Sequence, residues 1–110
     1  MIPPPLWPSA VGDERMSYVY VLRSLPTERL YRGWTTDLRR RLCEHNEGKS
    51  PATRGRGPYE LIYFEAYRHR EEALARERSL KKHPNVWKPL RARLYRTLIR
   101  ASSRAEEVVG

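Results

Sequence analysis

Residues 30–48, LYRGWTTDLRRRLCEHNEG, contain the signals of both a strand and a helix, and they therefore indicate the fold class. The opening LYRGWT is an extended run with two aromatic residues, which is typical of a strand. Thr35 or Thr36 is expected to cap the helix that follows, with Asp37 near the positive end of its dipole. Gly48 is placed to end this helix. The stretch predicts a strand and then a helix that carries three consecutive arginines and a histidine.

Two further strands are expected on either side of this stretch. SYVYVLRS over Ser17–Ser24 and YELIYFEAY over Tyr59–Tyr67 are rich in β-branched and aromatic residues. The turn-forming segment LPTER, residues 25–29, predicts that the first two strands pair as an antiparallel hairpin. Residues 49–58, KSPATRGRGP, predict a basic loop before the third strand.

Two more helices complete the predicted order. The second spans about Arg70–Lys82 and stops at His83 and Pro84. A break at residues 87–89 precedes a third helix, which has Leu90, Leu94 and Leu98 on one face and fraying expected from Ala105. The order β-β-α-β-α-α predicts an α+β fold, in which a small three-stranded sheet, mixed or antiparallel, is flanked by helices.

The chain length of 110 residues predicts one domain with one modest core. Prolines crowd the first sixteen residues, which predicts a loosely packed arm over residues 1–16. We expect the domain itself over residues 17–88 and a basic amphipathic helix with its tail over residues 89–110. Met1 and Met16 both remain open as the true start.

The charge of the chain points to a polyanionic partner. It has 22 basic and 13 acidic residues, a formal net charge of +9 and a pI near 10.2. Such a chain attracts phosphates through counterion release, so nucleic acid is the expected partner. Charge alone leaves anionic lipid and simple solubility open as alternatives.

The cysteine content and the hydropathy indicate where the protein is expected to act. Cys43 is the only cysteine, so no disulfide can form within the chain, and we expect a partly buried thiol in a reducing, cytoplasmic setting. No segment approaches the roughly 20 apolar residues that span a bilayer. The N-terminus lacks the pattern of a secretory signal. We therefore expect no membrane association.

The first helix has two functional faces in this interpretation. Leu38 and Leu42 are four residues apart and should face the sheet. Arg41 and His45 form a second such pair on the neighbouring row, which places Arg41 near the boundary of the core. Arg39 and Arg40 point elsewhere, as solvated charges that attract phosphate.

The second helix holds a carboxylate on its apolar side. Ala73, Leu74 and Leu80 define the inward face, and Glu77 lies between them. Burying an unpaired carboxylate is costly, so Glu77 should meet a cation, either Arg41 or a metal ion.

The hairpin adds tyrosines beside a glycine. Tyr20 shares a strand face with Tyr18 and Leu22, while Tyr31 comes just before Gly33, whose missing side chain permits close approach. A tyrosine hydroxyl beside a buried arginine and a buried glutamate can serve as a general base or orient water. Taken singly, such tyrosines are usually core residues.

These residues together resemble the GIY-YIG nuclease superfamily, especially its small single-domain bacterial members and structure-specific endonuclease domains. The resemblance covers about residues 17–87. It rests on YVY at 18–20, YRG at 31–33, the helix with Arg41 and His45, and the segments TRGRGPYELIYFE and EEALARERSLKK. The first half-motif reads YVY where the family name has GIY, and the second reads YRG where it has YIG, but both keep the tyrosines and the second keeps Gly33. Members often carry an asparagine after the metal-binding helix, and Asn85 is the residue near that place, although the spacing does not fix the match.

The resemblance implies a metal-dependent endonuclease that acts on DNA, with branched or damaged DNA as candidate substrates. Tyr20, Tyr31, Arg41, His45 and Glu77 would be catalytic, and Glu77 would bind a single Mg²⁺ or Mn²⁺. Nucleic acid would be contacted by a set of basic and aromatic side chains, namely Arg32, Trp34, Arg39, Arg40, Lys49, Arg54 and Arg56.

Two other functions remain open from the sequence. The same surface could bind nucleic acid without cutting it, with Trp34 more readily a core-edge aromatic than a stacking platform. The chain could also be a subunit that a protein partner activates. The oligomeric state, the specificity for substrate and the choice between DNA and RNA are not fixed by these patterns.

Overall fold

The structure is a computed structural model in which residues 16–109 are described, with side chains to Leu98. The predicted proline-rich arm therefore lies outside the described residues, except for Met16. Six elements follow in the predicted order: β1 (Ser17–Ser24), β2 (Leu30–Thr35), α1 (Leu38–Asn46), β3 (Tyr59–Tyr67), α2 (Arg70–Lys82) and α3 (Pro84–Val109). The α+β class is confirmed.

The sheet is antiparallel throughout, with the strand order β2-β1-β3. The predicted hairpin pairs Tyr20 of β1 with Gly33 of β2, and β1 also pairs along its other edge with β3. The register of β1 against β3 shifts between Val21 and Leu22. Because β1 is the central strand, it is buried on both faces, as its apolar sequence requires.

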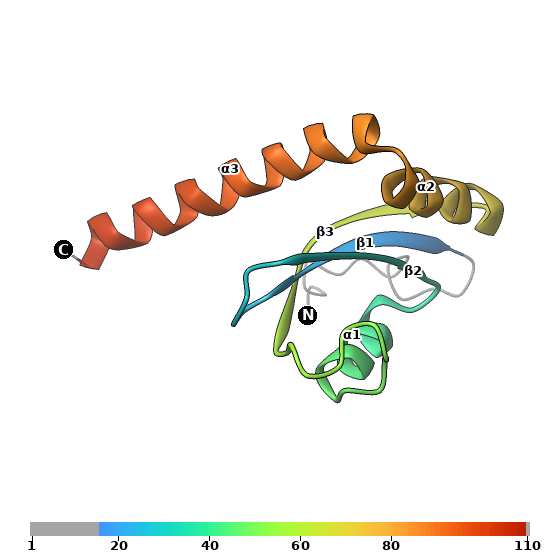
Figure 1. Cartoon of the computed structure of the whole chain (residues 1–110), viewed down its shortest axis with the longest axis horizontal. Coiled ribbons are helices and arrows are strands. Elements are labelled where there is room, and N and C mark those ends of the chain that lie inside the picture. The colour runs from blue at the N-terminus through green and yellow to red at the C-terminus, as the bar shows by residue number, and fades with distance from the viewer. Residues whose placement is uncertain (1–15, 110) are drawn as a thin grey trace, which may run out of the picture. The chain divides into compact units, whose positions relative to one another are not determined.

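One cluster of core residues lies on the face of the sheet that α1 covers. Tyr18, Tyr20 and Leu22 of β1 point to this face and pack with Leu38 of α1 and Tyr59 of β3. Leu42 packs against the same cluster, as the helical spacing predicted. Figure 1 shows α1 on one side of the sheet and α2 on the other.

The opposite face carries a polar cluster around Glu65. Arg76 of α2 donates two hydrogen bonds to the Glu65 carboxylate, at 2.9 and 3.0 Å, and the hydroxyls of Tyr63 and Tyr67 also donate to it. Burial alone would raise the pKa of Glu65, but these four hydrogen bonds lower it to about 2. Ala73, which is fully buried, lies one turn before Arg76. The ion pair therefore fixes the first part of α2 to β3.

Two local predictions about α1 were wrong. Asp37, not a threonine, is the N-cap of α1, because its carboxylate accepts a hydrogen bond from the Arg40 N–H while Thr35 belongs to β2. Cys43 is exposed rather than partly buried, since it points away from the row of Leu38 and Leu42. Gly48 does follow the end of α1, as predicted, and its φ of 76° is left-handed.

The third helix also begins earlier than predicted. It starts at Pro84, where proline suits the first helical turn, and it continues through Pro89 without the expected break. Its backbone remains helical to Val109, past the point where fraying was expected. Leu90 and Leu94 are buried, and Leu98 is half-buried.

The chain divides into two compact units between Arg78 and Ser79. The first contains the sheet, α1 and most of α2, and the second contains the end of α2 and α3. None of the described helices is both long enough and apolar enough to cross a bilayer.

Replacing Arg76 by methionine should destabilise the fold, because the Glu65 carboxylate would keep its buried site and lose its cation. We expect the free energy of unfolding to fall by about 1–3 kcal/mol, toward the lower end because the Arg76 side chain is 32% exposed. Urea unfolding at pH 7 measures the loss. The exposed neighbour Arg78→Met serves as the control, and equal stability of the two variants would contradict this role for the ion pair.

Candidate active site

The site is built around the hydroxyl of Tyr20, which β1 directs to the α1 face of the sheet. The side chain is 2% exposed and lies across Gly33 on the neighbouring strand. A Cβ atom at position 33 would come within 2.4 Å of the Tyr20 hydroxyl oxygen. The absence of a side chain at Gly33 is therefore what allows the tyrosine to occupy this position, as the sequence predicted.

His45 reaches the same hydroxyl from α1. Its Nε2 atom lies 2.9 Å from the Tyr20 oxygen, and its Nδ1 atom lies 2.6 Å from the hydroxyl oxygen of Thr53. The imidazole is 1% exposed and packs between the rings of Tyr20, Tyr31 and Tyr59. It is a buried histidine with a specific contact at each ring nitrogen.

Arg41 connects this buried pair to the surface. Its guanidinium lies beside Tyr20 and lowers the pKa of that hydroxyl, and it donates hydrogen bonds to the carboxylate of Glu44 at 2.9 Å and to the hydroxyl of Ser50 at 3.3 Å. The Arg41 side chain is 32% exposed, so one part of it remains accessible to solvent. Its closest acidic partner is thus Glu44, on its own helix, whereas the sequence had suggested Glu77.

Tyr31 is the fourth member of the group, and its ring lies beside those of Tyr20 and His45. Its ring centroid lies 5.2 Å from that of His45 and 6.5 Å from that of Tyr20. Tyr31 is half-buried on the edge strand β2, so its side chain is more accessible than that of Tyr20. Four predicted residues, Tyr20, Tyr31, Arg41 and His45, are therefore brought together from β1, β2 and α1.

Glu77 lies within electrostatic range of this group. It is half-buried on α2, and its negative charge is one of the influences that raise the pKa of Tyr20. Within residues 16–98, no three histidine, cysteine, aspartate or glutamate side chains gather as a metal cluster. A carboxylate such as that of Glu77 is a ligand that suits a hard cation with several bound waters.

The protonation states of the central pair follow from burial. Burial raises the pKa of Tyr20 to about 12, with the Arg41 guanidinium acting in the opposite direction. Burial and, to a smaller extent, the positive charge of Arg41 lower the pKa of His45 to about 4. Both side chains are therefore neutral near pH 7, and they share one proton across a 2.9 Å contact.

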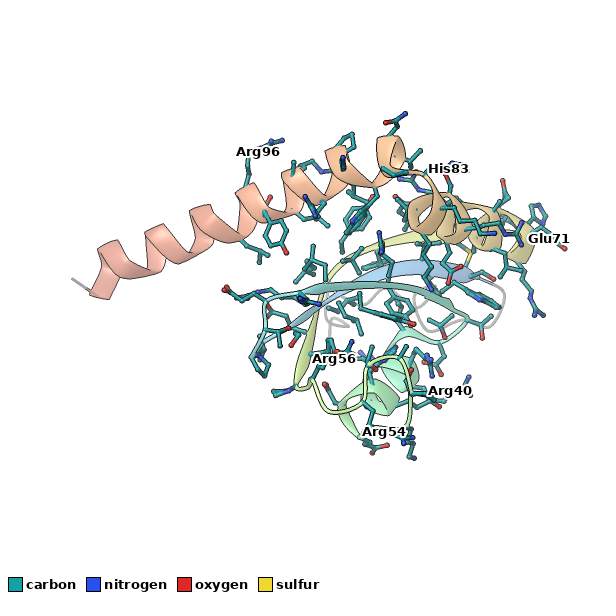
Figure 2. The ribbon with its side chains drawn as sticks, viewed as in Figure 1. Arg40, Arg54, Arg56, Glu71, His83 and Arg96 are labelled. Carbon is teal, nitrogen blue, oxygen red and sulfur yellow. The ribbon has the colours of Figure 1, made fainter. Side chains whose placement is uncertain are left out.

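Exposed basic side chains surround the site on the α1 side of the sheet. Figure 2 shows Arg40, Arg54 and Arg56 on this side, from α1 and from the loop that follows it. Arg39 and Lys49 are also exposed. Part of the predicted nucleic-acid surface, namely Arg39, Arg40, Lys49, Arg54 and Arg56, thus lies in the same part of the molecule as the buried group.

Two residues of the predicted surface lie elsewhere. Arg32 and Trp34 pair with Val21 and Val19, so strand alternation places them on the α2 face of the sheet. The guanidinium of Arg70 stacks over the Trp34 ring, 5.1 Å from its centroid. Trp34 is half-buried, which agrees with the interpretation of it as an aromatic at the edge of the core.

Sequence reasoning missed Thr53, Ser50 and Glu44. Glu44 could have been found, because it lies three residues after Arg41 on a predicted helix. Thr53 and Ser50 are in a loop, whose path no periodicity reports, yet both are buried. Asn85 is exposed in the first turn of α3, in the second compact unit.

Comparison with known proteins gives a consistent picture. Residues 16–89 match the family described as the GIY-YIG catalytic domain. A UPF0213 protein of Clostridium perfringens is 47% identical over 68 residues, which are 61% of this chain and 72% of that protein. A UPF0213 protein of Haloquadratum walsbyi is 45% identical over 67 residues, 60% of this chain and 74% of the relative. The solution NMR structure of a UPF0213 protein from Bacillus halodurans is 36% identical, with a TM-score of 0.45, and the match covers 72% of this chain and 84% of that one.

The buried histidine should make stability depend on pH. Because the pKa of His45 falls from 6.5 to about 4 on folding, the unfolded chain binds more protons between these values. The stabilisation is complete above pH 6.5 and is lost as the pH falls toward 4. Urea unfolding across this range should show a steeper loss for the wild type than for His45→Gln. The matched change at the exposed His83 should keep the wild-type slope, and an unchanged slope in His45→Gln would contradict the assignment.

A methyl group at position 33 should displace Tyr20. Gly33→Ala places Cβ 2.4 Å from the tyrosine oxygen and 2.6 Å from its Cζ atom, so the side chain must move away from His45. We expect a loss of about 1–3 kcal/mol in the free energy of unfolding. Gly57→Ala is the control, because its Cβ would meet nothing nearer than 3.7 Å. Thermal unfolding of the two variants measures the difference, and equal melting temperatures would exclude the close approach.

Proposed function

Because this chain belongs to the GIY-YIG catalytic domain family, we propose that it is a metal-dependent endonuclease that hydrolyses phosphodiester bonds in DNA. The observation that carries the proposal is the convergence of His45 and Arg41 on the hydroxyl of Tyr20 beside exposed arginines. A phosphate-binding surface requires the arginines alone. It does not require a buried hydroxyl that shares a proton with an imidazole.

Arg41 is the residue that would meet the scissile phosphate. It is partly exposed, and its planar guanidinium can donate charge-assisted hydrogen bonds to phosphate oxygens as negative charge develops on them. Its hydrogen bonds to Glu44 and Ser50 hold it between the buried residues Tyr20 and His45 and the solvent. Binding of phosphate there would also offset the positive charge that depresses the pKa of His45. The histidine would become a better proton acceptor when substrate arrives.

Tyr20 and His45 would then move the proton of the attacking water. As the water oxygen bonds to phosphorus, Tyr20 takes one water proton and gives its own proton to Nε2 of His45. The bond from phosphorus to the 3′ oxygen breaks, and the leaving oxygen takes a proton from solvent. Tyr31, which lies beside both rings and is more exposed, would orient the water.

Glu77 would hold the divalent cation, Mg²⁺ or Mn²⁺. Such an ion prefers oxygen ligands, keeps several waters, and stabilises negative charge on the phosphate and the leaving oxygen. A cation there would also remove the influence by which Glu77 raises the pKa of Tyr20. The carboxylate therefore fits the ion in charge and in donor type.

The proposal extends to the setting of the reaction. The net charge of +9 and the exposed Arg39, Arg40, Arg54 and Arg56 support binding to a DNA backbone. We propose branched or damaged DNA as the substrate and DNA repair in the cytoplasm as the setting. A protein partner could direct the enzyme to the bond that it cuts.

One observation favours a second candidate, a nucleic-acid-binding module that does not cut or that a partner must activate. With the pKa of Tyr20 near 12 and that of His45 near 4, the pair at rest contains no strong base at neutral pH. The same basic surface would then bind DNA without hydrolysing it.

A cleavage assay separates the two functions. Purified protein is incubated with branched, nicked, single-stranded and duplex DNA, with Mg²⁺, with Mn²⁺ and with a chelator. We expect cleavage that needs the metal and falls at least about 100-fold in Arg41→Ala and Glu77→Gln. DNA binding by Glu77→Gln should be retained.

Glu71→Gln is the matched control, because this exposed carboxylate lies on the same helix (Figure 2). It should cut as the wild type does. Binding without any cleavage under all these conditions would overturn the nuclease proposal in favour of the binding module. Cleavage that survives Glu77→Gln would remove Glu77 from the site.

A further inference from the structure

Thr53 is the innermost residue of the loop between α1 and β3, although its neighbours in sequence are exposed. It is 1% exposed, whereas Ala52 and Arg54 on either side of it are accessible. Its hydroxyl oxygen lies 2.6 Å from Nδ1 of His45, on the opposite side of the ring from Tyr20. The histidine is therefore held between two hydroxyl groups, one from β1 and one from this loop.

The contacts of Tyr20 decide which nitrogen of His45 carries the proton. Arg41 lies beside the Tyr20 hydroxyl, lowers its pKa and carries hydrogen-bond donors only, so the Tyr20 oxygen faces a donor on this side. The Tyr20 hydrogen then requires an acceptor of its own, and Nε2 of His45 at 2.9 Å is the atom placed to provide it. If Nε2 carried the proton, a buried O–H would face two donors. The geometry therefore favours the tautomer with hydrogen on Nδ1, which donates to Thr53.

The backbone keeps the Thr53 hydroxyl in place. The Thr53 N–H donates to the Ser50 carbonyl at 3.1 Å. Its carbonyl accepts from the Arg56 N–H at 3.3 Å and from the Tyr59 hydroxyl at 3.3 Å. The threonine is thus fixed to both ends of the loop and to β3. A hydroxyl fixed in this way can orient the imidazole before any substrate binds.

We propose that Thr53 is a positioning residue, which holds His45 in the Nδ1–H tautomer and so leaves Nε2 free to accept the proton of Tyr20. The effect on cleavage rests on the proposed nuclease function, whereas the effect on the tautomer does not. Thr53 acts only through His45, and no contact with substrate is assigned to it.

The first test reads the tautomer directly by nitrogen NMR of the histidine ring. In the wild type at pH 7, we expect His45 to carry its hydrogen on Nδ1. Thr53→Val keeps the shape of the side chain and removes the hydroxyl, so it should give a mixture of tautomers or the Nε2–H form. Thr53→Ser keeps the hydroxyl and should restore the wild-type spectrum. Thr97→Val, at an exposed threonine of α3, is the matched control.

The second test measures cleavage as a function of pH. Thr53→Val should lower kcat by about 10- to 100-fold with little change in KM, and Thr53→Ser should recover most of the rate. The pH profile of Thr53→Val should also shift, because His45 would titrate in a changed setting. The groups that face His45 are Tyr20, Tyr31, Tyr59, Arg41 and Glu44, and they are the same in every variant.

The outcomes distinguish the two proposals. An Nε2–H tautomer in the wild type, or an unchanged tautomer and pH profile in Thr53→Val, would overturn the role of Thr53. A protein that cuts no DNA would overturn the nuclease function, while the NMR result would still decide the role of Thr53. If Thr53→Val does not fold, the wild-type tautomer and the Thr53→Ser spectrum decide it.

Discussion

Strand β1 is buried on both faces, and this constraint determines which residues can act together. Along a strand, successive side chains point to opposite faces. Tyr18, Tyr20 and Leu22 therefore pack toward α1, while Val19 and Val21 pack toward the face that carries Glu65 and Arg76. The pairing register then places each residue of β2 and β3 either on the α1 face or on the face with Glu65 and Arg76. The site and the ion pair that anchors α2 are consequently separated by the thickness of the sheet.

Burial on the α1 face also sets the chemistry of the site. The same desolvation raises the pKa of Tyr20 and lowers that of His45, so the pair at rest is a neutral hydrogen bond. Neither side chain of such a pair is a strong base near pH 7 unless a charge nearby changes. Arg41 acts on the pKa of the buried hydroxyl and is itself partly exposed to solvent. A ligand at the surface can therefore alter the buried pair through Arg41 without entering the core.

The sequence predicted the elements well because each has a strong local signal. The bounds of β1, β3 and α2 follow from apolar strands and from helical spacing, and the same spacing brought Arg41 and His45 to the side of Tyr20. Errors arose where a local signal had two possible outcomes. Thr35 and Asp37 can both cap a helix, and a proline such as Pro89 can end a helix or lie within one. The ends of elements were therefore less certain than their existence.

The contacts of the loop could not be predicted, for a different reason. Residues 49–58 have no periodicity, so nothing in the sequence states which of their side chains turn inward. Thr53 is buried against His45 because the loop is tied to α1 and β3 by backbone and side-chain hydrogen bonds. A one-residue change in its path would present Ala52 or Arg54 to the histidine instead. Contacts between a loop residue and the neighbouring helix or strand therefore depend on the path of the whole loop.

The position of Glu77 connects the two faces of the sheet. It follows Arg76, the residue that fixes α2 to β3, yet its charge acts on Tyr20 on the other face. In the free chain this carboxylate makes ionisation of the tyrosine harder and would repel a phosphate at Arg41. For a surface that only binds DNA, a negative charge beside the phosphate site weakens binding. A cation bound by Glu77 would reverse both effects at once, and this reversal of charge is the physical argument for the metal dependence that we propose.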